Sequence, residues 1–245
     1  MLRGISLGAS LTPELTRSVR GLLSKRAEDC GRIPQLDFVG PEEATGGPLF
    51  LDLRPASLFA RGFIPGSINV TSSDCLRLFS QLPEFVRRPC YVIAASAVNR
   101  HAARVSLEKH AEIQVAGWLR PDVVREWGRK RGALAYFEEL DPDALAVRMA
   151  AWKTVVLDVR SAHSFAAGHV PDALHISLDI LRDSIAGLPA ETSLSLVCDS
   201  GERAGFAASL LGRIGYANVA IVRGGFRAYA ERGLPVVRHH ITTVN

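Results

Sequence analysis

Short apolar runs alternate with helix-period patterns along most of the chain. Mostly apolar runs at residues 49–53 and 194–197 are typical of buried strands. Residues 207–214 instead place apolar side chains at i, i+3, i+4 and i+7, which is one face of a helix. Further strands are expected at 36–39, 91–94, 114–118 and 154–159, and further helices at 99–110 and 141–149. This alternation predicts βαβ units and a mostly parallel sheet with helices on both faces.

The whole pattern occurs twice. The strand end Asp52-Leu53-Arg54 returns 106 residues later as Asp158-Val159-Arg160, and the turn after it returns at the same offset. A repeat of this length predicts two copies of one domain, each of about a hundred residues. We therefore expect an α/β protein with two tandem domains, each built on a mostly parallel five-stranded sheet. The expected boundaries are 1–30 for an N-terminal extension, 31–132 for the first domain and 133–245 for the second.

Composition fits a folded protein and excludes several function classes. Of 245 residues, 47% are hydrophobic and 22% charged, which is enough apolar material for a buried core. The net charge of +4 is mild and no basic run is interleaved with aromatics, so nucleic acid is not an expected partner. No apolar run reaches the length of a membrane span, so no membrane partner is expected either. The cysteines show no metal-site spacing, and reduced thiols favour a cytoplasmic location; they are Cys30, Cys75, Cys90 and Cys198.

The most informative stretch is Cys198-Asp199-Ser200-Gly201-Glu202-Arg203. It follows an expected strand and opens an expected helix, where backbone N–H groups and the helix N-terminus favour an anion. We therefore expect the pKa of the Cys198 thiol to be lowered. Gly201 allows a tight turn, and Arg203 can brace the loop or contact an anion. A lone cysteine is more often a buried core residue, and only the context of the repeat favours the chemical interpretation.

The first copy has the same loop without the cysteine. At the matching positions it reads Ala95-Ser96-Ala97-Val98-Asn99-Arg100, with the same length and the same terminal arginine. Alanine thus stands at the cysteine position and valine at the glycine position. The serine is one position off and has no evident base partner, so we expect only the second copy to be catalytic.

Taken together, these motifs resemble those of the rhodanese family. The shared features are two Asp-x-Arg strand ends, two Gly-x-x-Pro turns and a Cys-x-x-Gly-x-Arg loop at 198–203. The resemblance covers residues 32–245 as two tandem rhodanese-like domains, similar to the thiosulfate and 3-mercaptopyruvate sulfurtransferases. In two-domain members of that family the first domain is inactive and the second is active, which matches the contrast between Ala95 and Cys198.

The resemblance implies a sulfurtransferase. The Cys198 thiolate would attack the outer sulfur of a donor (thiosulfate, mercaptopyruvate or a persulfide) and become a persulfide itself. A small acceptor such as cyanide or a thiol, or a protein cysteine, would then take the sulfur. No metal or organic cofactor is implied. The substrate would be bound by the loop N–H groups, which belong to Asp199, Ser200, Gly201, Glu202 and Arg203.

Three further residues match supporting positions of the family. Asp158 and Arg160 match the Asp-x-Arg strand end and are expected to order the active-site side of the sheet. The alternative for them is a simple ion pair at a strand terminus. His169 matches the family's turn, where a structural hydrogen bond is expected rather than proton transfer.

The loop also departs from the thiosulfate-type members, which carry basic residues beside it. Asp199 and Glu202 are acidic, so they would raise the pKa of Cys198 and repel a doubly charged donor. The two-domain enzymes also carry an arginine four residues after the Asp-x-Arg arginine, and this position is Ser164 here. The identity of the donor therefore stays open.

Two other functions remain as alternatives. Related phosphatases of this fold have one more residue between the cysteine and the arginine, so phosphatase or arsenate reductase activity is disfavoured. The second alternative is a non-catalytic rhodanese-like scaffold that binds a partner. The presence of Cys198, Gly201 and Arg203 argues against it.

Overall fold

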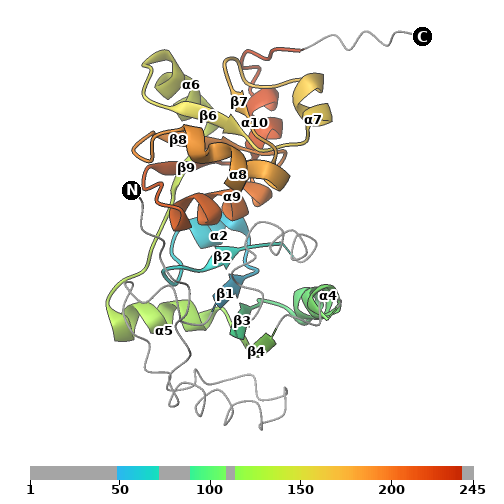
Figure 1. Ribbon diagram of the computed structural model, residues 1–245, viewed down its shortest axis with the longest axis vertical. Helices are drawn as coiled ribbons and strands as arrows, with labels where there is room; N and C mark the ends of the chain where they lie inside the picture. Colours follow the sequence, from blue (N-terminus) through green and yellow to red (C-terminus); the bar gives the residue numbers. More distant parts are fainter. Residues whose placement is uncertain (1–48, 72–88, 109–113, 239–245) are drawn as a thin grey trace, which may run out of the picture.

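The computed structural model describes residues 49–71, 89–108 and 114–238, which form two parallel β-sheets with their helices (Figure 1). The strand order is β2-β1-β3-β4 in the first sheet and β5-β9-β8-β6-β7 in the second. All strand pairs within these two sheets are parallel. The predicted α/β class and parallel pairing are therefore confirmed. The second sheet has the predicted five strands, whereas the expected strand at 36–39 and the extension at 1–30 lie outside the described residues.

The elements follow the expected order along the chain. The first sheet and its helices comprise β1 (Leu49–Asp52), α2 (Ala56–Ala60), β2 (Ile68–Asn69), β3 (Pro89–Ile93), α4 (Ala97–Leu107), β4 (Gln114–Leu119) and α5 (Asp122–Arg131). The second comprises β5 (Glu138–Leu140), α6 (Pro142–Ala150), β6 (Val155–Asp158), α7 (Ala162–Ala167), β7 (Leu174–His175), η3 (Leu178–Ile180), α8 (Leu181–Ser184), η4 (Ile185–Gly187), β8 (Leu194–Val197), α9 (Glu202–Arg213), β9 (Val219–Val222) and α10 (Gly225–Glu231).

Helix α4 departs slightly from the prediction. A helix was expected at 99–110, but it begins at Ala97 because the side chain of Ser96 caps it by accepting a hydrogen bond from Asn99 N at 3.1 Å. Residues 109 and 110 lie outside the described ranges. Ser96 is thus a helix cap rather than a candidate nucleophile.

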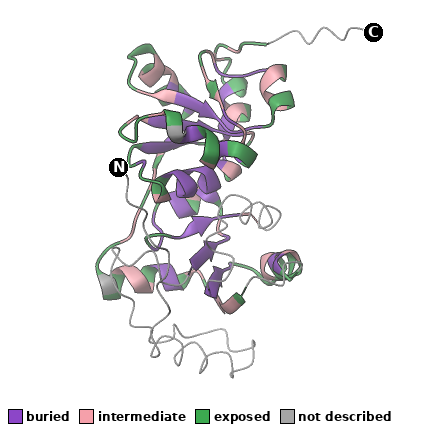
Figure 2. Ribbon diagram, viewed as in Figure 1, coloured by how far each residue is buried: buried purple, intermediate pink, exposed green. Residues whose placement is uncertain are grey.

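Alternate residues of the second sheet face opposite helix layers, as in a sheet covered on both sides. In β6, Leu157 packs in a core that includes α9, whereas Val156 packs in a core that includes α6 and α10. The α9 core also includes Leu51 and Val92 of the first sheet. The two sheets therefore share one apolar interior, which Figure 2 shows as buried ribbon running between them.

Helix α9 connects the two sheets physically. Its residues 204–211 are all buried, and the Ser209 hydroxyl accepts a hydrogen bond from Asn69 N at 3.0 Å. Gly205 allows the close approach, because a Cβ there would lie 2.1 Å from Asn69 Oδ1. Arg213 Nη1 donates to Gly66 O at 2.7 Å. The helix that follows Cys198 is therefore anchored on β2 of the first sheet.

None of the helices in the described ranges combines the length and the apolar character that a bilayer crossing requires.

Candidate active site

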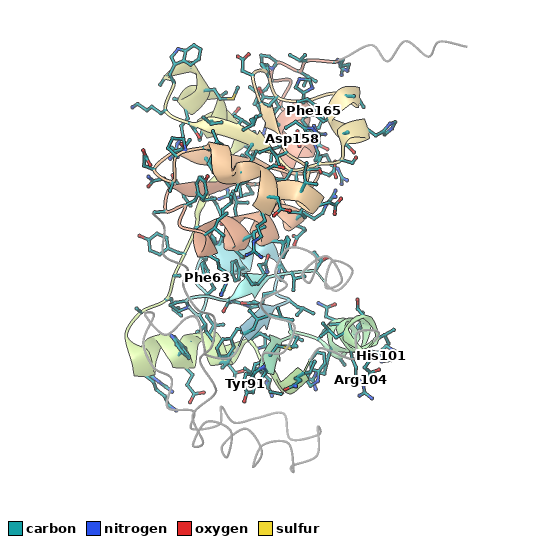
Figure 3. The ribbon with its side chains drawn as sticks, in the orientation of Figure 1. Phe63, Tyr91, His101, Arg104, Asp158 and Phe165 are labelled. Carbon is teal, nitrogen blue, oxygen red and sulfur yellow. The ribbon has the colours of Figure 1, made fainter. Side chains whose placement is uncertain are left out.

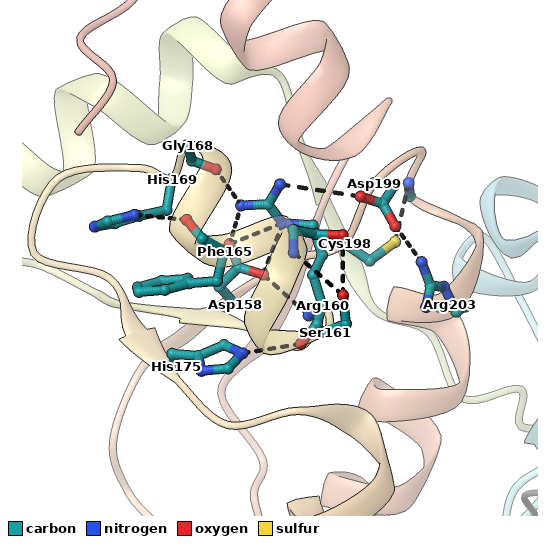
Figure 4. Close-up of polar contacts among 12 residues, drawn as sticks. Asp158, Arg160, Ser161, Phe165, Gly168, His169, His175, Cys198, Asp199 and Arg203 are labelled. Atoms are coloured by element: carbon teal, nitrogen blue, oxygen red, sulfur yellow. Dashed lines mark hydrogen bonds and ion pairs between the residues drawn. The ribbon is translucent and has the colours of Figure 1, made fainter. Parts of the chain in front are cut away.

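Cys198 lies directly after β8, and a short loop leads from it into α9 (Figure 4). This is the strand–loop–helix arrangement that the sequence predicts. Gly201 caps α9 with a φ of +91°, in the left-handed region that glycine adopts without strain. The turn brings Gly201 N to 3.1 Å from Cys198 Sγ, to which it donates a hydrogen bond. Cys198 is only 1% exposed, so the sulfur lies at the bottom of this loop.

The electrostatic environment of the sulfur differs from the prediction. Burial raises the pKa of the Cys198 thiol, because the thiolate would lose its hydration. The N–H groups of Ala204, Ser200 and Gly201 and the charge of Arg203 act in the opposite direction, but burial is the larger cause. The expectation of a lowered pKa is therefore wrong, although the backbone amides converge on the sulfur as expected.

Helix α10 supports the same loop, through contacts that sequence reasoning missed. Phe226 N donates to Cys198 O at 2.7 Å, and Arg227 N donates to Asp199 O at 3.1 Å. Gly225 lies so close that a Cβ would be 2.2 Å from Cys198 O. The available signal was the glycine pair at the end of β9, since adjacent glycines often mark a close backbone approach.

Asp158 and Arg160 form a buried ion pair beside this loop (Figure 4). Figure 3 shows Asp158 in the same half of the molecule as Phe165. Arg160 Nε lies 3.0 Å from both carboxylate oxygens of Asp158, and its Nη2 donates to Oδ2 at 2.7 Å. The same Nη2 also donates to Gly168 O at 2.7 Å, and the guanidinium lies over the Phe226 ring at 4.1 Å. The pair thus ties the end of β6 to the turn after α7 and to α10, which goes beyond a simple terminal ion pair.

Two histidines stack on the Phe165 ring beside this framework. His169 Nδ1 donates to Phe165 O at 2.9 Å, and its ring stacks on the Phe165 ring with centroids 3.8 Å apart. His175 Nε2 donates to Arg160 O at 2.9 Å and its ring also stacks on Phe165. These contacts give His169 the expected structural hydrogen bond. His175 had no distinguishing signal in the sequence, since its partner is a backbone carbonyl 15 residues away.

The charged residues of the loop do not all face the sulfur. Arg203 Nη2 donates to Asp199 Oδ2, so Arg203 braces the loop, and Arg160 Nη1 lies 3.9 Å from Asp199 Oδ1. Glu202 accepts a hydrogen bond from Ala56 N at 3.2 Å and so contacts the start of α2 in the first sheet. Ser200 is exposed. The structure therefore brings the whole predicted set of site residues to one end of the second sheet, with Glu202 at the contact with α2.

A shallow depression of about 550 Å³ adjoins the loop. It is lined by Asp199, Phe226, Arg227, Ala230 and Glu231. Within the described ranges, no three His, Cys, Asp or Glu side chains are grouped closely enough to hold a metal ion. The loop itself offers a thiol surrounded by backbone N–H donors.

Comparison with known proteins places the similarity in the second half of the chain. Residues 141–232, which contain β6 to β9, match the Rhodanese-like domain family. A sulfurtransferase of Allochromatium vinosum is 34% identical over 100 residues, which are 40% of this chain and 94% of that protein. The thiosulfate sulfurtransferase GlpE of Pseudomonas savastanoi is 35% identical over 75 residues, which are 31% of this chain and 71% of that protein.

Among solved structures, a rhodanese-related protein of Thermoplasma volcanium matches 41% of this chain and 98% of its own, with 26% identity and a TM-score of 0.37.

Proposed function

Because this chain belongs to the rhodanese family, we propose that it is a sulfurtransferase whose Cys198 carries a sulfur atom from a donor to a thiophilic acceptor. The observation that carries this proposal is the loop after β8, where Gly201 N donates a hydrogen bond to Cys198 Sγ. The N–H groups of Ser200 and Ala204 act on the same sulfur. Such a set of donors stabilises a negatively charged terminal sulfur, as an oxyanion hole stabilises an oxygen.

The reaction consists of two displacements at sulfur. The Cys198 thiolate attacks the outer sulfur of the donor, a bond from Sγ to that sulfur forms, and the remainder of the donor leaves with the electron pair. The leaving group is sulfite from thiosulfate, the pyruvate enolate from mercaptopyruvate, or a thiolate from a persulfide. In the second step cyanide or a thiolate attacks the outer sulfur and the Cys198 thiolate leaves. Neither step needs an external oxidant or reductant, and ping-pong kinetics follow.

The residues around the loop have positioning roles in this proposal. Asp158 and Arg160 hold the end of β6 against α10, whose backbone N–H groups in turn hold the carbonyls of Cys198 and Asp199. His169 fixes the turn that supplies a carbonyl to Arg160. The first sheet, with Ala95 at the cysteine position, is proposed to be an inactive copy of the same domain. Its contacts with α9 give it a supporting role.

Mass spectrometry tests the proposal directly. The full chain is incubated with thiosulfate, mercaptopyruvate or cysteine persulfide, and the peptide that contains Cys198 is expected to gain the mass of one sulfur atom. Cys198→Ser should abolish both the adduct and turnover with cyanide. Cys90→Ser is the matched control, because Cys90 is also a buried cysteine but lies in β3 of the first sheet, so activity should be retained.

One observation favours a second candidate, the non-catalytic scaffold. The sulfur is almost fully buried and its pKa is raised, which are features of an unreactive thiol. If all three donors leave Cys198 unmodified, the scaffold is the better description. Release of phosphate from an aryl phosphate ester would instead support a phosphatase.

A further inference from the structure

The charges beside the sulfur are already paired within the protein. Arg203 donates to the Asp199 carboxylate, and Arg160, which is only 2% exposed, is bound by Asp158 and lies 3.9 Å from Asp199. Both arginines that border the loop thus face a carboxylate. Asp199 and Arg203 are the members of this group that are partly open to solvent, with 40% and 30% of their side chains exposed. An incoming anion that approaches Arg203 therefore also meets the Asp199 carboxylate to which Arg203 is bound.

The depression beside the loop has the same character. Of its five lining residues, Asp199 and Glu231 are acidic and Arg227 is basic. The Phe226 ring and Ala230 add apolar surface. A small inorganic dianion in this depression would meet two carboxylates and one guanidinium, and this net negative charge repels it. An organic group of low charge would instead cover the apolar part of the depression.

We propose that Asp199 is a specificity-determining residue, which favours a persulfide carried on an organic thiol over a dianionic donor such as thiosulfate. This inference rests on the proposed function and concerns the choice of donor. In the favoured reaction, the Cys198 thiolate attacks the outer sulfur of R–S–SH and forms Cys–S–SH, and the S–S bond of the donor breaks with departure of RS⁻. The neutral donor brings no charge into the site, and the charge of the thiolate leaves on RS⁻. When thiosulfate approaches, the site must also accommodate its two negative charges, and two negative charges leave with sulfite.

The test compares the two donors on variants of one residue. The rate of Cys198 sulfuration is measured by mass spectrometry against concentration of thiosulfate and of cysteine persulfide, which gives a second-order rate constant for each. Asp199→Asn removes the charge and releases Arg203, so the thiosulfate-to-persulfide ratio of rate constants should rise at least about tenfold. Asp199→Glu keeps the charge and should leave that ratio within about threefold of the original.

Asp122→Asn is the matched control, because Asp122 is an exposed aspartate on α5 of the first sheet and its loss changes the net charge equally. The proposal predicts no change of the ratio in this variant. An equal gain for both donors in Asp199→Asn, or the same gain in Asp122→Asn, would overturn it. If the unmodified chain takes sulfur from neither donor, the proposed function itself fails, and the inference fails with it.

Discussion

The loops after β3 and β8 occupy equivalent places in the two sheets, and they differ in where the following helix begins. In the first, Ser96 caps α4 and the helix starts at Ala97. In the second, Gly201 caps α9 and the helix starts at Glu202, whose counterpart in the first loop is Asn99. The helix therefore begins two residues earlier in the first sheet. The residues that surround the sulfur in one loop belong to the first turn of a helix in the other.

One residue accounts for this difference. Gly201 adopts a φ of +91°, whereas Val98 at the same position is helical. A β-branched residue is strongly disfavoured in the left-handed region, so the first loop continues into a helix at once. The two loops have equal length and each ends in an arginine. The backbone N–H groups converge on one point only in the loop whose backbone can adopt the left-handed conformation.

An ion pair follows β1 in the first half and β6 in the second, and it is common to both halves. Arg54 binds Asp52 and Gly62 O in the same pattern in which Arg160 binds Asp158 and Gly168 O. Both halves therefore share this framework, although only the second has a cysteine in the loop concerned, and the two arginines make a matched pair for mutation.

The largest effect is expected from that pair. Arg160→Met leaves the Asp158 carboxylate buried without its partner, which should lower the free energy of unfolding by about 3–5 kcal/mol. Arg54→Met should cost somewhat less, because Arg54 is 11% exposed where Arg160 is 2% exposed. Urea denaturation measures both. A loss below about 1 kcal/mol in Arg160→Met would show that water reaches Asp158 and that the pair is not a structural support.

Gly201→Val converts the loop after Cys198 toward the sequence of the first loop, which has Val98 at this position. The variant should lose at least about a hundredfold in the rate of Cys198 sulfuration, because the turn that aims Gly201 N at the sulfur becomes strained. Gly215→Val is the control: it also has a positive φ, of +105°, but nothing lies within 4 Å of its added Cβ. It should cost stability and retain activity. Equal activity in the two variants would mean that the left-handed turn is not needed for catalysis.

The raised pKa of Cys198 predicts the pH dependence of sulfur transfer. Since the thiolate is the nucleophile in the proposed reaction, the rate constant with thiosulfate should rise about tenfold per pH unit toward a midpoint above the ordinary thiol value of about 8.5. Arg203→Met should move the midpoint still higher, because the charge of Arg203 lowers this pKa. Sulfuration rates between about pH 7 and pH 10 measure both. A midpoint below the ordinary value would show that the amides outweigh burial.

The smallest effect concerns a tyrosine in each half. The Tyr91 hydroxyl is buried without a hydrogen-bond partner among the described residues, and burial raises its pKa to about 12. Tyr91→Phe should therefore stabilise the fold, by up to about 1 kcal/mol. Tyr216→Phe should do the opposite, since the Tyr216 hydroxyl lies 2.9 Å from Ile185 O and 2.7 Å from Leu188 O. Shifts of the same sign in thermal unfolding would contradict this contrast.

The amino-acid sequence by itself determined the order of strands and helices, the parallel pairing and the place of Cys198 between a strand and a helix. These follow from hydrophobic periodicity and from glycine and proline signals, which act over a few residues. The match between Asp52-x-Arg54 and Asp158-x-Arg160 likewise predicted a shared framework, because both members of each ion pair lie two residues apart.

Only the tertiary structure decided how far the Cys198 sulfur is buried and which partners the charged residues of the loop contact. The burial of Cys198 and the contacts of its loop depend on segments that are far away along the chain. Gly225, which supports the loop, lies 27 residues after Cys198, and Ala56, whose N–H donates to Glu202, lies 146 residues before Glu202. No local pattern encodes such contacts. Desolvation depends on everything packed around an atom, so the pKa of Cys198 could be assigned a direction only once the helices on both sides of the loop were in place.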